Sequence, residues 1–212
     1  MKWIHWFKNP VFSIGFLILL HLTGWIGFWL LGKDFFLLTP LNMILSTVIL
    51  FYHHQKWTRS LQIKLLLVTL LGFAVEVAGI NTGKIFGVYF YDQALGFKIW
   101  GTPPLIGINW VLLTYAATVL FKKWIRSIYI NAVLSAILLV VLDLIIEPVA
   151  IANGFWHWQD PEIPLQNFIA WGLCAVIFSL LIQSQDEPLE NPLAFAFIAI
   201  QFVFFGVLCW FT

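Results

Sequence analysis

The chain has 212 residues, of which 61% are apolar and only 10% are charged, and its formal net charge is +1. Soluble domains carry about 25% charged residues, so this deficit excludes an ordinary soluble domain and indicates a protein surrounded by lipid. The nearly neutral charge, without a long basic run, also excludes a nucleic-acid-binding surface. We expect membrane lipids around the protein and no nucleic acid among its partners.

Seven apolar windows predict transmembrane helices, because a spanning helix needs about 20 mostly apolar residues. In chain order the windows are 11–32, 35–54, 61–81, 105–121, 128–152, 165–184 and 192–211. The first window is too long for the apolar core of a signal peptide and lacks a small-residue cleavage site, so we expect a retained helix. The sequence therefore predicts an all-α polytopic membrane protein, a bundle of about seven transmembrane helices that forms a single domain over residues 1–212.

Three acidic residues fall inside these windows, where ionisable groups are costly and indicate function. Glu76 lies fifteen residues after Leu61, and Asp143 lies fifteen residues after Ile128. Both helices are expected to run in the same direction, so both acids lie at about the same depth, roughly 22 Å from the helix starts. Glu147 follows Asp143 by four residues and shares its helix face. We expect all three carboxyls to face one cavity, although bonds between neighbouring helices would be a purely structural explanation.

Other polar and aromatic residues are expected at the same end of the bundle. The connections 82–104 and 153–164 are both rich in aromatic residues, which suit a membrane interface. Asparagines that begin or end helices at this level are Asn42, Asn81, Asn109, Asn153 and Asn167. The sequence thus predicts a carboxylate-bearing pocket that is covered by tryptophan and tyrosine.

The histidines carry weaker signals. His157 lies beside the level of the carboxyls and is a candidate proton shuttle. His21 is mid-helix and is either a structural hydrogen-bonding group or a member of the pocket, whereas His53 and His54 are expected to be solvated at the membrane surface. A metal site built from the three acids and His157 has no spaced ligand motif to support it, so we expect no metal.

Five motifs follow Glu76 in order along the chain: GKIFGVYFY (83–91), GTPPLIGINW (101–110), DLIIEPVA (143–150), NGFWHW (153–158) and PLQNFIAW (164–171). Together with Glu76, these motifs resemble those of the carotenoid biosynthesis membrane protein family. The resemblance covers roughly residues 70–172, and one departure is the order Gly101-Thr102-Pro103-Pro104, where the family pattern is glycine–valine–proline.

This resemblance implies a carotenoid 1,2-hydratase, a hydro-lyase that adds water to the terminal isopropylidene group of a linear or monocyclic carotenoid. The substrate would enter from the bilayer, water would be the second reactant, and no cofactor would be needed. Glu76, Asp143 and Glu147 would be the catalytic acids. The expected substrate-binding residues are Tyr89, Tyr91, Asn109, Trp110, Trp156, His157, Trp158, Asn167 and Trp171.

Two other functions remain open and a third is excluded. A carotenoid cyclase of the lycopene type also protonates an alkene, but an internal double bond traps the cation. A non-catalytic carotenoid-binding or transport protein would share the aromatic pocket. A retinal protein needs a lysine in its last helix, and the window 192–211 contains none.

The distribution of basic residues predicts the orientation, because lysine and arginine gather on the cytoplasmic side. Eight lie on the side of the N-terminus, namely Lys2, Lys8, Lys56, Arg59, Lys64, Lys122, Lys123 and Arg126, against Lys33, Lys84 and Lys98 on the other side. We therefore expect a multi-pass protein of the cell membrane with a cytoplasmic N-terminus.

This orientation can be tested by cysteine labelling. Single cysteines placed within 82–104 or 153–164 should react with a membrane-impermeant maleimide added from outside, because both connections are expected on the non-cytoplasmic side. A cysteine placed within 55–58 is the matched control and should react only after the membrane is opened. Labelling in the opposite sense would reverse the topology.

Overall fold

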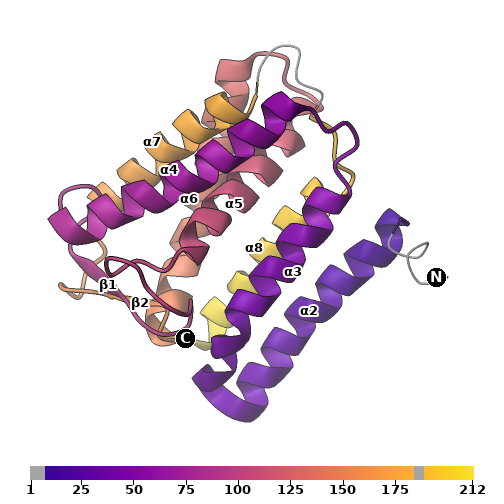
Figure 1. The fold of residues 1–212 in the computed structure, drawn as a ribbon. Helices are drawn as coiled ribbons and strands as arrows, with labels where there is room; N and C mark the ends of the chain where they lie inside the picture. Colours follow the sequence, from indigo (N-terminus) through magenta and orange to yellow (C-terminus); the bar gives the residue numbers. More distant parts are fainter. Residues whose placement is uncertain (1–7, 184–188) are drawn as a thin grey trace.

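The computed structural model describes residues 8–183 and 189–212, and over these residues the fold is mainly helical (Figure 1). The elements in chain order are α2 (Pro10–Leu31), the 3-10 helix η1 (Gly32–Leu38), α3 (Thr39–Tyr52), α4 (Arg59–Thr82), β1 (Tyr89–Tyr91), α5 (Leu105–Lys122), α6 (Ile128–Ala152), β2 (Trp156–Trp158), α7 (Leu165–Ile182) and α8 (Ala194–Phe211). Six segments are long and apolar enough to span a membrane, and the first, Pro10–Tyr52, contains both α2 and α3. The predicted all-α membrane bundle is confirmed, and a count of about seven helices fits.

The turn between α2 and α3 replaces part of the second predicted window. Gly32 ends α2 with a φ of 71°, a backbone conformation that glycine adopts without strain. Pro40 then lies in the first turn of α3, where a missing N–H is tolerated. The predicted helix 35–54 therefore becomes η1 followed by α3, and α2 and α3 lie side by side in opposite directions (Figure 1).

The helices form two groups around α5 and α6. Helix α4 packs mainly on α5, α6 packs mainly on α7, and α4 also contacts α7, so these four helices enclose a common interior. Helix α8 packs against α5 and α6, and it also contacts α2. Helix α3 packs against α5. Helix α5 is consequently buried along most of its length.

A two-stranded antiparallel sheet covers one end of the four-helix group, which we call the strand end. The pairs are Tyr89 with Trp158, Phe90 with His157, and Tyr91 with Trp156. Side chains alternate between the two faces of a sheet, so the two tyrosines share one face with the two tryptophans. The sequence predicted only loops in both connections, because strands of three residues are too short to leave a periodic pattern.

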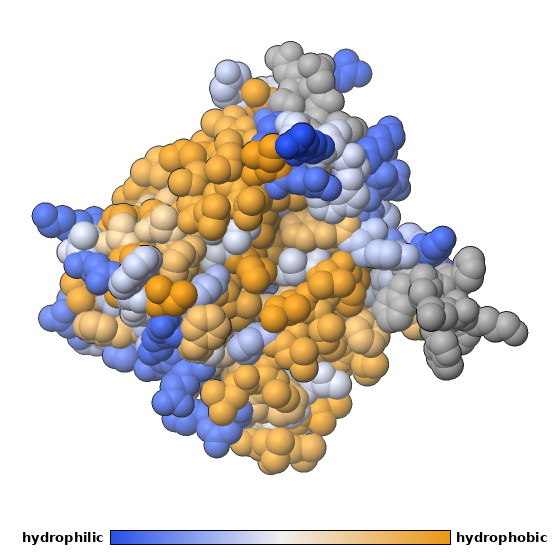
Figure 2. Space-filling model, viewed as in Figure 1, coloured by the Kyte–Doolittle hydropathy of each residue, from blue (hydrophilic) through white to orange (hydrophobic). Residues whose placement is uncertain are grey.

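The surface between the two ends of the bundle is apolar. Figure 2 shows hydrophobic residues spread over the helices and hydrophilic residues gathered toward the ends. Exposed leucines and isoleucines occur on every long helix except α5 and α8, as expected of side chains that face lipid tails. The chain is therefore a multi-pass membrane protein.

His53 and His54 differ from the prediction that they are solvated. Both are buried, with exposed fractions of 8% and 4%. His53 bonds to the Ser13 hydroxyl at 2.8 Å, and His54 bonds to the Tyr115 hydroxyl at 2.6 Å. The α3–α4 connection therefore folds inward and ties α2 and α5 to the end of α3, which the sequence alone did not indicate.

Two glycines allow α4 and α5 to approach closely. A Cβ atom added to Gly107 would lie 2.4 Å from the backbone oxygen of Thr69, and one added to Gly72 would lie 2.7 Å from the Cβ of Trp110. Both distances are shorter than any normal contact, so a side chain at either position would push the helices apart. This contact holds Trp110 in the interior of the four-helix group.

We expect Gly107→Ala to destabilise the protein by about 1–3 kcal/mol, the usual cost of overpacking a tight contact. Gly206→Ala on α8 is the matched control, because its added Cβ meets no atom within 4 Å. There the better helix propensity of alanine should leave stability unchanged or raise it by up to about 1 kcal/mol. Thermal unfolding of both variants in one detergent measures the difference, and equal melting temperatures would contradict the proposed close contact.

Candidate active site

Three buried carboxyls lie inside the four-helix group near the strand end. Glu76 comes from α4, and Asp143 and Glu147 come from successive turns of α6. Each residue is only 2% exposed. Carboxyl groups removed from water in this way need hydrogen-bond donors, and the surrounding elements provide them.

Glu76 accepts hydrogen bonds from three aromatic side chains. The Trp110 indole N–H donates to Oε1 at 2.9 Å, and the Tyr91 hydroxyl donates to Oε2 at 2.8 Å. The Tyr89 hydroxyl donates to the same Oε2 atom. Because β1 supplies two of these donors, the strand end fixes the position of a carboxyl on α4.

Glu147 is held in a similar way by β2 and α7. The indole N–H groups of Trp156 and Trp158 both donate to Oε2 at 3.0 Å. Asn167 on α7 donates to Oε1 of Glu147 at 3.1 Å and to Oδ2 of Asp143 at 3.2 Å. One amide nitrogen therefore bridges two carboxyls that are one helical turn apart.

Aromatic contacts join these two sets of hydrogen bonds into one network. The rings of Tyr89 and Trp158 lie 5.0 Å apart, which connects a partner of Glu76 with a partner of Glu147. Trp171 on α7 stacks on Trp110 at a centroid distance of 4.0 Å. We call this network the acid cluster; its members are Glu76, Asp143, Glu147, Tyr89, Tyr91, Trp110, Trp156, Trp158, Asn167 and Trp171.

The two phenols are neutral donors at physiological pH. Burial raises the pKa of Tyr89 and of Tyr91, and the adjacent carboxylate of Glu76 raises both pKa values further. Since neither phenol loses its proton near neutrality, the bonds to Glu76 persist over that range.

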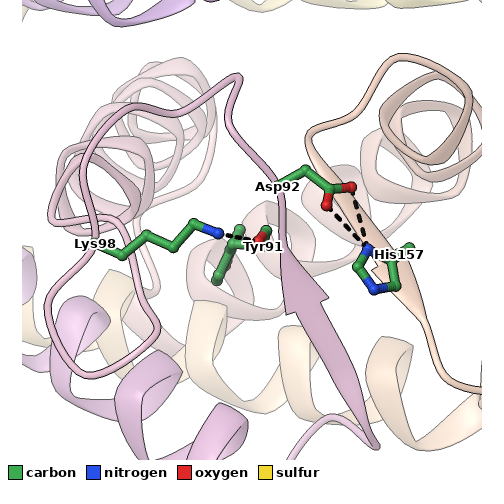
Figure 3. A network of polar contacts seen from close by, with 4 residues as sticks. All are labelled: Tyr91, Asp92, Lys98 and His157. Atoms are coloured by element: carbon green, nitrogen blue, oxygen red, sulfur yellow. Dashed lines mark hydrogen bonds and ion pairs between the residues drawn. The ribbon is translucent and has the colours of Figure 1, made fainter.

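Two residues predicted for substrate binding lie outside the acid cluster. His157 is on the opposite face of the sheet, where its Nδ1 atom contacts both carboxylate oxygens of Asp92 at 3.1 Å (Figure 3). Its side chain is 53% exposed. Asn109 lines a separate cavity, which is formed by α2, η1, α3, α5, α6 and α8. The geometry thus brings together the other ten predicted residues and separates these two.

The pairing of β1 with β2 decides this division. Tyr-Phe-Tyr and Trp-His-Trp each alternate, so the outer residues of each triplet point inward and the middle residue points outward. This alternation is visible in the sequence, and it was the one signal that could have excluded His157 from the interior. Lys98 also supports the strand, because its ammonium group donates to the Tyr91 carbonyl oxygen (Figure 3).

The arrangement suits acid–base chemistry on an apolar molecule. Asp143 accepts one hydrogen bond from the described residues, whereas Glu76 and Glu147 accept three each. Hydrogen bonds from N–H and O–H groups favour the ionised carboxylate. No group of three histidine, cysteine, aspartate or glutamate side chains within the described ranges is arranged to hold a metal ion.

Comparison with known sequences gives the family. The profile of the family described as "Carotenoid biosynthesis protein" matches residues 38–212. The chain belongs to the carotenoid biosynthesis protein family. Every residue of the acid cluster lies within the matched region, so the cluster is part of the family domain.

A curated relative carries a more specific name. The bisanhydrobacterioruberin hydratase of Haloarcula japonica is 28% identical over 133 residues, which cover 58% of this chain and 45% of that protein. This carotenoid biosynthesis protein therefore aligns with less than half the length of that relative. No solved structure matches the chain.

We expect Asn167→Leu to lower the free energy of unfolding by about 2–3 kcal/mol, because two buried carboxyls would lose a donor. His157→Gln is the control and should cost about 0–1 kcal/mol, because it alters only the exposed contact with Asp92 and the ring contact with Phe90. Thermal unfolding in detergent measures both. Similar losses in the two variants would argue that Asn167 does not hold Asp143 and Glu147 together.

Proposed function

We propose that this protein is a carotenoid 1,2-hydratase, a hydro-lyase that adds water to the terminal isopropylidene double bond of a linear or monocyclic carotenoid. The observation that carries the proposal is the bridge by which Asn167 joins Asp143 to Glu147 under an aromatic cover. Membership of a carotenoid biosynthesis family and the name of the relative support the same reaction.

The reaction requires a proton donor and a proton acceptor. Asp143 has the fewest hydrogen-bond donors, so it is the carboxyl best suited to carry a proton in the resting protein. In our proposal it gives that proton to the less substituted alkene carbon. The π electrons form the new C–H bond, and the neighbouring carbon becomes a tertiary cation.

Water then completes the addition. Its oxygen forms a C–O bond with the cation, and the proton that it releases passes to Glu147, which three N–H donors favour as a carboxylate. Transfer of this proton to Asp143, one turn away on α6, restores the starting state. The sum is alkene plus water to tertiary alcohol, with no change of oxidation state and therefore no need for a redox cofactor.

The aromatic side chains stabilise the charge that develops between these steps. Ring faces attract cations through their quadrupoles, and the tryptophans and tyrosines of the acid cluster supply such faces. When it is ionised, Glu76 adds a negative charge whose position is set by Trp110, Tyr89 and Tyr91. A low dielectric strengthens both effects relative to water.

The setting of the reaction follows from the substrate. A carotenoid dissolves in the bilayer, so we propose that it enters laterally between helices, while water enters at the strand end. We further propose that the protein resides in the cell membrane with its N-terminus in the cytoplasm, which places the acid cluster toward the outer leaflet.

Isotope labelling tests the reaction. In cells that make lycopene and express this protein, the product should gain 18 mass units, and oxygen-18 from labelled water should appear in its hydroxyl group. Label from molecular oxygen would identify a hydroxylase instead. A product of unchanged mass but altered retention would indicate a cyclase, and an unchanged pigment that remains bound to the protein would indicate a binding or transport protein.

We expect Asp143→Asn and Glu147→Gln to lower turnover by about 10²–10⁴-fold, the usual contribution of a general acid or base. Both changes keep the size of the side chain and remove the acid. Asp92→Asn is the matched control outside the acid cluster and should leave turnover nearly unchanged. Full activity in both cluster variants would leave the carboxyls with a structural role only.

A further inference from the structure

An internal cavity lies beside the acid cluster and is not explained by it. This cavity of about 210 Å³ is enclosed by α2, η1, α3, α5, α6, α8 and the residues around β2. Most of its lining is apolar, and none of the three acid-cluster carboxyls lines it. Pockets that enclose a whole drug-sized ligand measure about 300–1,000 Å³, so this one would hold only part of a long molecule.

Three amide side chains line this apolar cavity from three different helices. Asn42 lies on α3, Asn109 on α5 and Gln201 on α8. Within the described part of the chain, the Asn109 side chain makes no hydrogen bond, and Asn42 uses only its Oδ1 atom, which accepts from Ser46. Polar groups of this kind are costly in a membrane bundle unless a partner satisfies them.

The third amide also keeps an acceptor free for a ligand. The Nδ1 atom of His21 bonds to the Leu17 carbonyl oxygen at 2.8 Å, so Nδ1 carries the proton and Nε2 is an acceptor in the neutral ring. Gln201 therefore donates its amide N–H to Nε2 at 3.0 Å. Its carbonyl oxygen can still accept a hydrogen bond from a molecule in the cavity.

A single layer of side chains separates the cavity from the acid cluster. The ring of Trp156 lines the cavity, while its N–H donates to Glu147. Ile146, next to Glu147 on α6, and Asn109, next to Trp110 on α5, line the cavity as well. A molecule in the cavity would therefore lie close to Glu147, on the other side of one indole ring.

The cavity also reaches the lipid-facing surface. Leu38 at the end of η1 and Leu41 at the start of α3 line it and are 51% and 55% exposed. In a membrane these side chains contact lipid tails, so an apolar chain could enter between them without crossing water.

We infer that this cavity binds the terminal isoprenoid segment of the carotenoid, and that Asn42, Asn109 and Gln201 bind a hydroxyl group within it. The hydroxyl belongs either to the water that reacts or to a tertiary alcohol on the chain. The inference rests on the proposed function for the identity of the chain. The rest of the polyene extends past Leu38 and Leu41 into the bilayer, and the end of the chain passes Trp156 to reach Glu147.

Filling the cavity tests where the chain binds. Leu45 on α3 lines the cavity, whereas the adjacent Ile44 does not and is 47% exposed. Affinities of purified protein for lycopene and for its 1-hydroxy derivative can be measured by quenching of tryptophan fluorescence. We expect Leu45→Trp to weaken the affinity for each of the two carotenoids by at least tenfold. Ile44→Trp is the matched control and should change each affinity less than twofold. Unchanged affinities in a folded Leu45→Trp variant would overturn the assignment. If Leu45→Trp does not fold, Ile146→Phe fills the same cavity from α6 and serves as the test.

Removing one amide tests the hydroxyl assignment and distinguishes its two sources. Asn109→Leu removes no hydrogen bond within the described protein, so the melting temperature should not change. If the bound hydroxyl belongs to the carotenoid, the affinity for the 1-hydroxy derivative should fall about tenfold and the affinity for lycopene should not change. If the bound hydroxyl belongs to water, both affinities should remain the same and turnover should fall about tenfold. No change in any of these quantities would overturn the assignment.

A matched asparagine and the independence of the two assays complete the design. Asn131 donates to the Thr118 carbonyl oxygen and accepts from Ser135, away from the cavity, so Asn131→Leu should lower the melting temperature without changing either affinity.

Binding of a carotenoid can be measured without turnover, so the cavity and the hydratase reaction are tested independently. Loss of affinity in Leu45→Trp without any product hydration in the wild type would keep the pocket and reject the hydratase, whereas hydration with unchanged affinities in Leu45→Trp would do the reverse.

Discussion

Placing carboxyl groups inside a lipid-surrounded bundle costs free energy, and this cost explains which side chains gather at the strand end of the protein. An acidic side chain at the centre of a membrane helix costs about 2.5–3.5 kcal/mol on insertion scales, so each one must be given partners by the fold. Here nearly all the partners of Glu76 and Glu147 are indole and phenol groups, which combine an apolar ring with one hydrogen-bond donor. Such side chains give a carboxyl its hydrogen-bond donors and still present apolar rings to the rest of the bundle.

The small sheet also supplies hydrogen-bond donors to the buried carboxyls. Donors placed on α4 and α6 alone would leave the ends of both carboxyls open to the strand end, whereas β1 and β2 bring two tyrosines and two tryptophans over them. The pairing also couples the two halves of the site, because the ring of Tyr89 lies against that of Trp158.

In the proposed hydratase, the acid cluster and the cavity beside it would have different tasks. The acid cluster is rich in hydrogen-bond donors and lies between α4, α5, α6 and α7. The cavity on the other side of Trp156 is mainly apolar and reaches lipid at Leu38 and Leu41. An apolar chain and a charged reaction centre have opposite solvation requirements, so separating them by one aromatic wall allows both to be met within one bundle.

The sequence by itself determined the membrane class, the approximate helices and the three acids, because these depend on composition and on spacing along single helices. The four-residue interval from Asp143 to Glu147 places them on one face whatever surrounds them. Which of the nearby residues meet those acids was decided only by the tertiary structure. The contacts of Tyr89, Trp158 and Asn167 join segments far apart in the chain, and the register of two three-residue strands turns His157 outward while its neighbours turn inward. The burial of His53 and His54 and the position of Asn109 likewise depend on how helices pack, and spacing along one chain carries no information about that.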